Sequence, residues 1–463
     1  MMKRTQILFL VLLTISFSVI AQKQDNEILE LNIKQAQEYA IENNKSLKNT
    51  KTDVKIAKQQ LWQTISQGLP QVSGTLDYTN YFNYKMTLGI GGSSSTPNID
   101  YTKLDAGDME ILTMLGSILG GGATEIKMKD NANAKLQISQ LIFSGQYIAG
   151  IQLAKISQML VDMSIEKSEL DIKESITNSY YVSLITLKSM EIIDKNIENL
   201  SQTLKQTNAL LSAGMVEETD ADQIKMSINM LENAKRSLQR NAELNNNLMK
   251  FQLGIDYDTK LVLTEKYDDL LADVNLSGVL RSEFLPEENI NVKLTNKQEE
   301  LSQKMLNMQR WSYAPTLFGA YNHTEKLLKS DFDMNPKNLF TLNLSVPIFS
   351  SGQRKASVEQ KKLELLKVQN TKEIIIDQLM LQEKQLRYNL TSAFEQYQSQ
   401  LENLELAKKI YRNTDLKFRQ GVVSSFDLIQ ANNNLIQAEN SVISASMEVL
   451  QAKLEFDKLI NSI

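Results

Sequence analysis

Residues 145–214 read GQYIAGIQLAKISQMLVDMSIEKSELDIKESITNSYYVSLITLKSMEIIDKNIENLSQTLKQTNALLSAG, and residues 352–421 read GQRKASVEQKKLELLKVQNTKEIIIDQLMLQEKQLRYNLTSAFEQYQSQLENLELAKKIYRNTDLKFRQG. Both stretches run from Gly to Gly over 69 positions (214 − 145 and 421 − 352). Neither contains Pro, and Gly150 is the single internal Gly, so each can form one unbroken helix. At 1.5 Å per residue such a helix is about 100 Å long, far beyond the helices of ordinary globular domains. We therefore expect a protein that spans a distance.

The duplication continues on both sides of these helices. Matching segments precede them, Phe143-Ser144-Gly145-Gln146 and Phe349-Ser350-Ser351-Gly352-Gln353, and matching segments follow them, Gly214-Met215-Val216 with Asp220 and Gly421-Val422-Val423 with Asp427. Gly accepts the left-handed geometry that ends helices, so the chain is expected to reverse there. A carboxylate suits the positive start of the return helix, which explains the two Asp residues.

This pattern predicts an organisation in four parts. They are a signal peptide at 1–21, a first structural repeat at 22–255 with its tip near residue 214, a connecting segment at 256–290, and a second repeat at 291–463 with its tip near residue 421.

The N-terminal residues are typical of a secretory signal. Lys3 and Arg4 are followed by an apolar stretch from Ile7 to Ile20 and by a small-residue cleavage site at Val19-Ile20-Ala21. A membrane anchor helix is the alternative, but the stretch is shorter than the roughly 20 residues that a span needs. We expect the mature protein to be exported.

The composition excludes several classes of protein. The net charge of −5 shows no basic excess for nucleic acid. The chain has no Cys, which excludes disulfides, thiolate metal sites and a lipoprotein cysteine. His323 is the only His, and a lone His is poor evidence for a metal site or a catalytic base. No phosphate-binding loop or nucleophile elbow is present. We expect no enzymatic activity, no cofactor and no metal.

Between the helices the apolar period changes from helical to alternating. Four strands are predicted, around 72–79, 132–139, 318–321 and 340–348. The first two strands flank a long Gly- and Ser-rich loop at 84–130, which we expect to be exposed or functional. Helices are predicted at 31–66 and 291–309, and short helices with loops at 256–288.

The second return helix has the clearest heptads. Leu428, Leu435, Val442, Val449 and Phe456 hold one position, and Ala431, Ala438, Ala445, Ala452 and Leu459 hold the other. Such a repeat predicts coiled-coil packing with close helix approach at the alanines.

Four strands with one apolar face cannot close a barrel by themselves. An apolar strand face without a soluble core to cover it favours a transmembrane β-barrel shared by several copies. Two copies would supply eight strands and three would supply twelve, enough for a channel.

In these features the chain resembles the TolC-like outer membrane factors, the outer membrane efflux protein family. The segments that carry the resemblance are Leu31-Asn32-Ile33-Lys34-Gln35-Ala36 with Asn43-Asn44, Leu69-Pro70-Gln71-Val72, the two Phe-Ser-Gly junctions and the two Gly tips. Their order, duplication and spacing cover nearly all of the mature chain.

The resemblance implies an α+β membrane protein in the Gram-negative outer membrane. Its long antiparallel helices would form a coiled-coil barrel through the periplasm, and four strands per chain would contribute to a 12-stranded transmembrane barrel of a homotrimer in outer membrane lipid. It implies a passive duct of a tripartite efflux pump or type I secretion system, which works with a periplasmic adaptor and an inner-membrane pump of the RND or ABC type. The substrate, the pump and the resting state of the aperture stay open.

The resemblance also assigns roles to the tips. The adaptor would contact Gly214, Met215, Val216, Gly421, Val422 and Val423, although plain helix reversal explains the same residues. Asp427, with Asp220 as its counterpart, would line the aperture in a ring that favours cations; a helix-start carboxylate is the alternative.

This sequence departs from the family at the tip. Gln430 replaces a second acid, and Phe418 and Val423 stand where some members have a Tyr and a basic residue that tie the closed tip. Arg419 could substitute. A soluble periplasmic coiled-coil scaffold or adaptor is the alternative function; it explains the heptads and the export signal but not the strands.

Overall fold

The structure is a computed structural model, and it describes residues 28–463 except 83, 89–101, 103, 112–123, 128, 273–277, 279–280, 282 and 329–335. The predicted signal peptide and much of the predicted loop at 84–130 lie outside the described residues. The described part of that loop needs correction, because β3 (Lys85–Leu88) and β4 (Thr124–Lys127) pair there as antiparallel strands.

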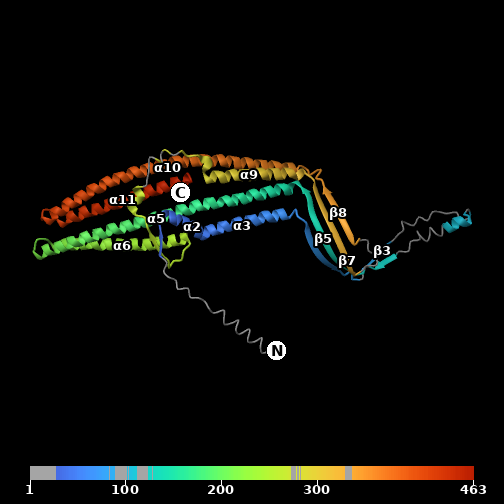
Figure 1. The fold of residues 1–463 in the computed structure, drawn as a ribbon, viewed down its shortest axis with the longest axis horizontal. Coiled ribbons are helices and arrows are strands. Elements are labelled where there is room, and N and C mark those ends of the chain that lie inside the picture. Colours follow the sequence, from blue (N-terminus) through green and yellow to red (C-terminus); the bar gives the residue numbers. More distant parts are fainter. Residues whose placement is uncertain are drawn as a thin grey trace, which may run out of the picture. The chain divides into compact units, whose positions relative to one another are not determined.

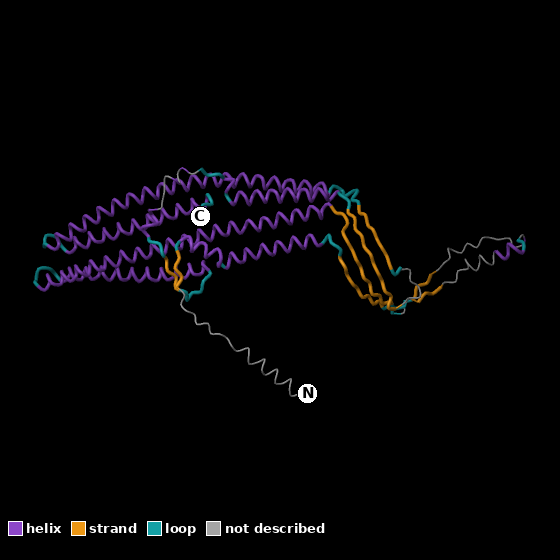
Figure 2. Tube along the Cα trace, viewed as in Figure 1, coloured by secondary structure: helices purple, strands orange, loops and turns teal. Residues whose placement is uncertain are grey.

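Long helices dominate the described chain (Figures 1 and 2). The helices are α2 (Ile33–Asn43), α3 (Lys45–Ser66), α5 (Gly145–Ser212), α6 (Glu218–Leu253), α7 (Tyr267–Ala272), α9 (Ile290–Arg310), α10 (Gln353–Arg419) and α11 (Ser425–Leu459), with 3-10 turns η3 (Pro286–Glu288) and η4 (Trp311–Tyr313). The strands are β1 (Ile28–Leu31), β2 (Gln71–Thr79), β3 (Lys85–Leu88), β4 (Thr124–Lys127), β5 (Asn131–Ser144), β6 (Lys260–Leu263), β7 (Thr316–Leu328) and β8 (Asn338–Ser345). Both predicted long helices are present, with 68 residues in α5 and 67 in α10.

The chain forms two compact units, and each draws on both halves of the sequence. One comprises Met1–Lys58, Ile156–Ser302 and Glu364–Ile463, and the other comprises Gln59–Lys155 and Gln303–Leu363. We refer to them as the helical unit and the strand unit.

The strand unit contains an antiparallel sheet in the order β2-β5-β7-β8, which confirms the four predicted strands. The register aligns Val72, Ile138, Tyr321 and Phe340 in one row across the sheet. Apolar side chains alternate with polar ones along β2, along the first part of β5 and along β8 from Phe340, whereas β7 does not alternate. The side chains of the apolar face are exposed in the single chain; Val72, Leu76, Tyr78, Leu136, Ile138, Tyr321, Phe340, Leu342 and Leu344 belong to this face. This sheet therefore has an apolar face that the described part of the chain does not cover.

The helical unit contains two antiparallel hairpins, α5 with α6 and α10 with α11. The predicted heptad residues of α11 form its buried side, with Ala438 alone only half-buried. Residues from α5, α6 and α11 share one core cluster: Ile193, Leu200, Ile224, Leu231, Ile429 and Ile436. The two hairpins therefore pack on each other within one chain.

The predicted helix at 31–66 is wrong in two places. Leu31 lies in β1, and the helix breaks at Asn44. The Asn44 side chain accepts hydrogen bonds from the amides of Ser46 (2.8 Å) and Leu47 (3.1 Å) and donates one to the carbonyl of Gln252 (2.7 Å). A short amide side chain that bonds the local backbone competes with helix continuation, which is why α2 ends and α3 begins there.

The predicted loops and short helices at 256–288 also need correction, because this segment contains β6. β6 pairs in parallel with β1, with Ile28 opposite Lys260 and Leu31 opposite Leu263. A four-residue strand whose partner lies more than 200 positions away leaves no local periodicity to detect.

Candidate functional site

Both hairpins reverse through the same backbone geometry. Gly214 and Gly421 each have a φ of 73°, in the left-handed region that favours Gly. The amide of Met215 bonds the carbonyl of Leu210, and the amide of Val422 bonds that of Lys417, both at 2.9 Å. These are the 6→1 bonds of a Schellman ending.

The apolar side chains after each Gly point outward. Met215 is 71% exposed and Val422 is 68% exposed, while Val216 and Val423 are half-buried. Exposed apolar side chains at a tip form a surface that a partner can cover.

Asp427 lies in the first turn of α11. Its carboxylate accepts hydrogen bonds from the Ser424 hydroxyl (2.8 Å) and amide (3.0 Å), and its own amide donates to the Ser424 hydroxyl (3.2 Å). This is a capping box. The hydroxyl and amide of Ser424 lower the pKa of Asp427, so this exposed carboxylate is ionised at neutral pH.

Asp220 occupies the equivalent position in α6, and it connects the two hairpins. One carboxylate oxygen accepts from the amide of Glu217 at 3.1 Å. The other accepts a short hydrogen bond from the hydroxyl of Ser425, which is only 3% exposed. The tip of the first hairpin is thereby bonded to the start of α11.

Arg419, expected as a substitute in a tip lock, pairs with Asp415 of its own helix at 2.9 Å. Phe418 is buried, with 4% of its surface exposed. Within the single chain, the hydrogen bond from the Ser425 hydroxyl to the Asp220 carboxylate joins the tips of the two hairpins.

Sequence reasoning missed a polar stripe on α11, of which three residues are buried and Glu439 is half-buried. Every seventh residue is polar: Ser425, Asn432, Glu439 and Ser446. Three of these residues form hydrogen bonds with earlier parts of the chain. Ser425 donates to Asp220 of α6, and Glu439 accepts from the side-chain amide of Asn196 of α5 at 2.9 Å. Ser446 accepts from the hydroxyl of Tyr267, in the connecting segment, at 2.7 Å. The seven-residue spacing beside two apolar heptad positions was the available signal.

Glu439 makes stability depend on pH. Burial raises its pKa, against the opposing effect of the Asn196 hydrogen bond and of Lys408 and Lys195. At a pH between the pKa of Glu439 in the unfolded protein and its raised pKa in the folded protein, the folded state binds more protons than the unfolded state. The free energy of unfolding therefore falls as the pH rises through this window. We expect Glu439→Gln to remove this fall and to be more stable than wild type at neutral pH.

Urea unfolding from about pH 4 to about pH 8 measures this effect. Glu198→Gln, at an exposed site on α5, is the matched control and should keep the wild-type slope. A Glu439→Gln slope equal to that of wild type would contradict the assignment.

The two strand–helix junctions use Gly for different reasons. A Cβ on Gly145 would lie 2.2 Å from the ring of Trp311, so this Gly permits close packing. Gly352 has a φ of 83° and free space where a Cβ would lie, so it serves the turn. Of the neighbouring aromatic residues, Phe143 is 40% exposed and Phe349 is 83% exposed.

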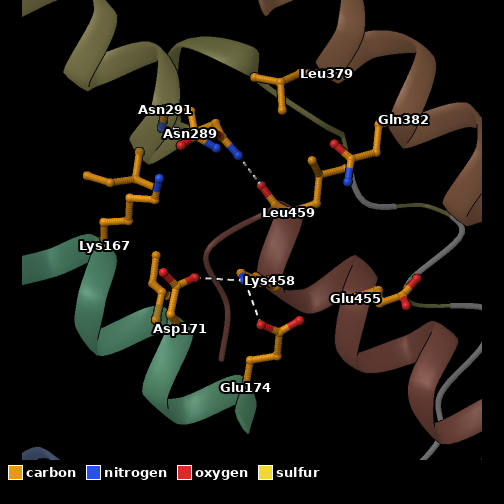
Figure 3. Close-up of a pocket in the computed structure, with 12 residues that line it drawn as sticks. Lys167, Asp171, Glu174, Asn289, Asn291, Leu379, Gln382, Glu455, Lys458 and Leu459 are labelled. Carbon is orange, nitrogen blue, oxygen red and sulfur yellow. Dashed lines mark hydrogen bonds and ion pairs between the residues drawn. The ribbon is translucent and has the colours of Figure 1, made fainter. Parts of the chain in front are cut away.

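A cavity of about 610 Å³ lies between α5, α10, the start of α9 and the end of α11 (Figure 3). Lys458 extends into it and bonds Asp171 (2.8 Å) and Glu174 (2.5 Å). Asn289 donates to the carbonyl of Leu459 at 2.8 Å. Although burial acts to lower it, these carboxylates raise the pKa of Lys458. The charges pair with each other across the cavity and tie the end of α11 to α5.

Among the described residues, no helix combines the length and the apolar character needed to cross a membrane. The same residues contain no group of three or more His, Asp or Glu that could hold a metal ion.

Three comparisons relate this chain to known proteins. Residues 278–462 match the family described as "Outer membrane efflux protein". No curated protein sequence matches significantly. The fold matches solved structures at TM-scores of 0.66 to 0.71.

Three of these structures illustrate the likeness. CusC is 13% identical over 93% of this chain and 92% of its own, with a TM-score of 0.71. VceC of Vibrio cholerae is 12% identical over 92% and 95%, with a TM-score of 0.67. The CmeC outer membrane channel of Campylobacter jejuni is 14% identical over 93% and 86%, with a TM-score of 0.68.

Proposed function

We propose that this protein is the outer-membrane duct of a tripartite efflux pump or type I secretion system. The family match of residues 278–462 and the fold shared with TolC-like outer-membrane channels confirm the resemblance and support this proposal. The duct is passive, and an inner-membrane pump supplies the energy through a periplasmic adaptor. The family match and the fold do not favour the alternative of a soluble scaffold.

The uncovered apolar sheet face carries the proposal. Exposed residues such as Leu76 (78%) and Phe340 (66%) would cost free energy in water but suit the acyl chains of a bilayer. The edge strands β2 and β8 run in opposite directions, so β8 of one copy can pair in the antiparallel sense with β2 of the next. Three copies then contribute twelve strands to one closed barrel, which leaves no open edge.

The tips would form the periplasmic end of the duct. Exposed Met215 and Val422 support the assignment of the two Gly turns as adaptor contacts. Asp427 is exposed and ionised, as a residue of a cation-selecting ring must be.

Planar-bilayer conductance of the detergent-purified mature protein tests the proposal. We expect stable channels that prefer cations, and a weaker preference in Asp427→Ala. Asp427→Asn is the matched variant, because it removes the charge and keeps one oxygen, which can accept from both the amide and the hydroxyl of Ser424.

Channels whose selectivity is unchanged in both variants would leave the duct standing and reduce Asp427 to a capping residue. A protein that forms no channel and stays soluble without detergent would overturn the duct.

A further inference from the structure

The sheet of the strand unit has a second face, opposite the apolar one. Residues paired across antiparallel strands have side chains on the same face, and neighbours along a strand point to opposite faces. The row that contains Val72 and Ile138 belongs to the apolar face, and the register between β5 and β7 is regular from Asn133 to Leu141. Rows an odd number of positions away therefore belong to the second face, and two of them are Ser73 with Gln137 and Asn322, and Thr75 with Lys135 and Thr324. The second face is polar.

Lys135 is a cationic residue without a partner on this polar face. It lies on β5, an inner strand of the sheet, between the uncharged Thr75 of β2 and Thr324 of β7. Its side chain is half-buried, and within the described part of the chain it forms no hydrogen bond and no ion pair. On the opposite face, by contrast, Glu325 pairs with Lys337 at 2.6 Å. The ammonium group of Lys135 is therefore available to a solute.

The polar face has a positive charge balance. Its charged residues within β2, β5, β7 and β8 are Asp77, Lys135 and Lys326, which gives a net charge of +1 per chain (2 − 1). Asp77 and Lys326 belong to one row, on either side of Asn133. Lys135 belongs to the next row of the same face, and Asp77 lies diagonally across from it without pairing with it. One acid thus leaves the face positive.

We propose that Lys135 forms an anion-binding ring inside the barrel, in which three copies of the chain place one ammonium group each. This inference rests on the proposed trimeric duct, whose closed barrel turns the apolar face to lipid and the polar face inward. Rings of Lys or Arg side chains select anions in pores, and walls of low dielectric constant focus their field on the solute. The ligands of this ring are small carboxylates, phosphates and other anions.

The Lys135 ring lies toward the end of the sheet that is away from the helices. β5 begins at Asn131 and continues directly into α5 at Gly145, so Lys135 is close to the free end of the strand. In the proposed duct this end faces the outside of the cell. The sign of the ring is opposite to that of the ring proposed for Asp427, so the two rings act on the same solute in opposite senses.

A single introduced thiol can measure the potential at the ring, because the chain has no Cys. Thr324→Cys places this reporter directly opposite Lys135. The measurement compares the rates at which an anionic and a cationic methanethiosulfonate of similar size modify it in the detergent-purified trimer. We expect Lys135→Gln to lower the ratio of the anionic to the cationic rate by about fourfold at about 0.1 M salt, because three charges within about 10 Å are removed.

Two controls accompany this measurement. Lys355→Gln removes an exposed Lys near the start of α10, beyond the other end of the sheet, and should leave the ratio at Thr324→Cys unchanged. Leu136→Cys reports the opposite face, which detergent covers in the trimer. We expect both reagents to modify Leu136→Cys much more slowly than Thr324→Cys.

A ratio at Thr324→Cys that Lys135→Gln leaves unchanged would overturn the inference. Faster modification of Leu136→Cys than of Thr324→Cys would also overturn it, because Lys135 would then face the membrane. Planar bilayers give an independent readout: we expect Lys135→Gln to strengthen the cation preference, whereas Asp427→Ala weakens it. Channels whose cation preference is not strengthened by Lys135→Gln would refute the ring and leave the duct standing, while a wild-type protein without channels would count against the duct itself.

Discussion

Tyr180→Ala is expected to lower the free energy of unfolding by about 3–5 kcal/mol, because it empties the largest site in the core of the helical unit. Tyr180 is fully buried, in a cluster that joins β1, α2, α5 and α6. Its hydroxyl donates to the carbonyl of Leu31 (3.0 Å) and accepts from the amide of Glu265 (3.2 Å). The substitution therefore creates a cavity and also removes two bonds that hold the end of β1 and the segment after β6.

Urea denaturation of the detergent-solubilised protein, followed by helical circular dichroism, measures this loss. Tyr180→Phe is the graded control: it keeps the ring and loses the hydroxyl, and should cost about 1–3 kcal/mol. A Tyr180→Ala variant within about 1 kcal/mol of wild type would mean that this cluster does not limit stability.

Gly254→Ala is the second substitution with a large expected effect, about 2–5 kcal/mol. Gly254 ends α6 with a φ of 73°, where a Cβ costs about 1–2 kcal/mol by itself. The new Cβ would also lie 2.4 Å from the carbonyl oxygen of Asn43. That oxygen belongs to the backbone at the end of α2, so the two helix ends must move apart.

Gly214→Ala separates the two causes. Gly214 has the same φ of 73° and no heavy atom within 4 Å of an added Cβ, so it should show the backbone cost alone. The difference between the two urea midpoints measures the clash. Equal losses in the free energy of unfolding for Gly254→Ala and Gly214→Ala would show that the ends of α2 and α6 move apart at no cost in stability.

Local patterns predicted most of the fold. The absence of Pro and the Gly at each end predicted α5 and α10, and the heptads predicted the buried side of α11. Alternating apolar residues predicted β2, β5 and β8, and Phe318, Ala320 and Tyr321 indicated β7. The sequence also located the two tips, because a Gly that ends a helix in the left-handed conformation is recognisable from its immediate neighbours. The tip residues as adaptor contacts and Asp427 as an aperture residue stay predictions.

The errors have one physical cause in common. Asn44 breaks the opening helix partly through a bond to Gln252, and β6 exists because β1 lies beside it. Neither partner is near in the sequence, so no local period records the contact.

The sequence by itself determined the lengths of the two long helices, the places where the chain reverses, and the apolar faces of β2, β5 and β8, because these depend on residues within a few positions of one another. Only the tertiary structure decided how the hairpins meet. The bond from Ser425 to Asp220 spans 205 positions and that from Asn196 to Glu439 spans 243. Such contacts depend on the angle and register at which one helix packs against another, and the periodicity of the sequence does not fix this geometry.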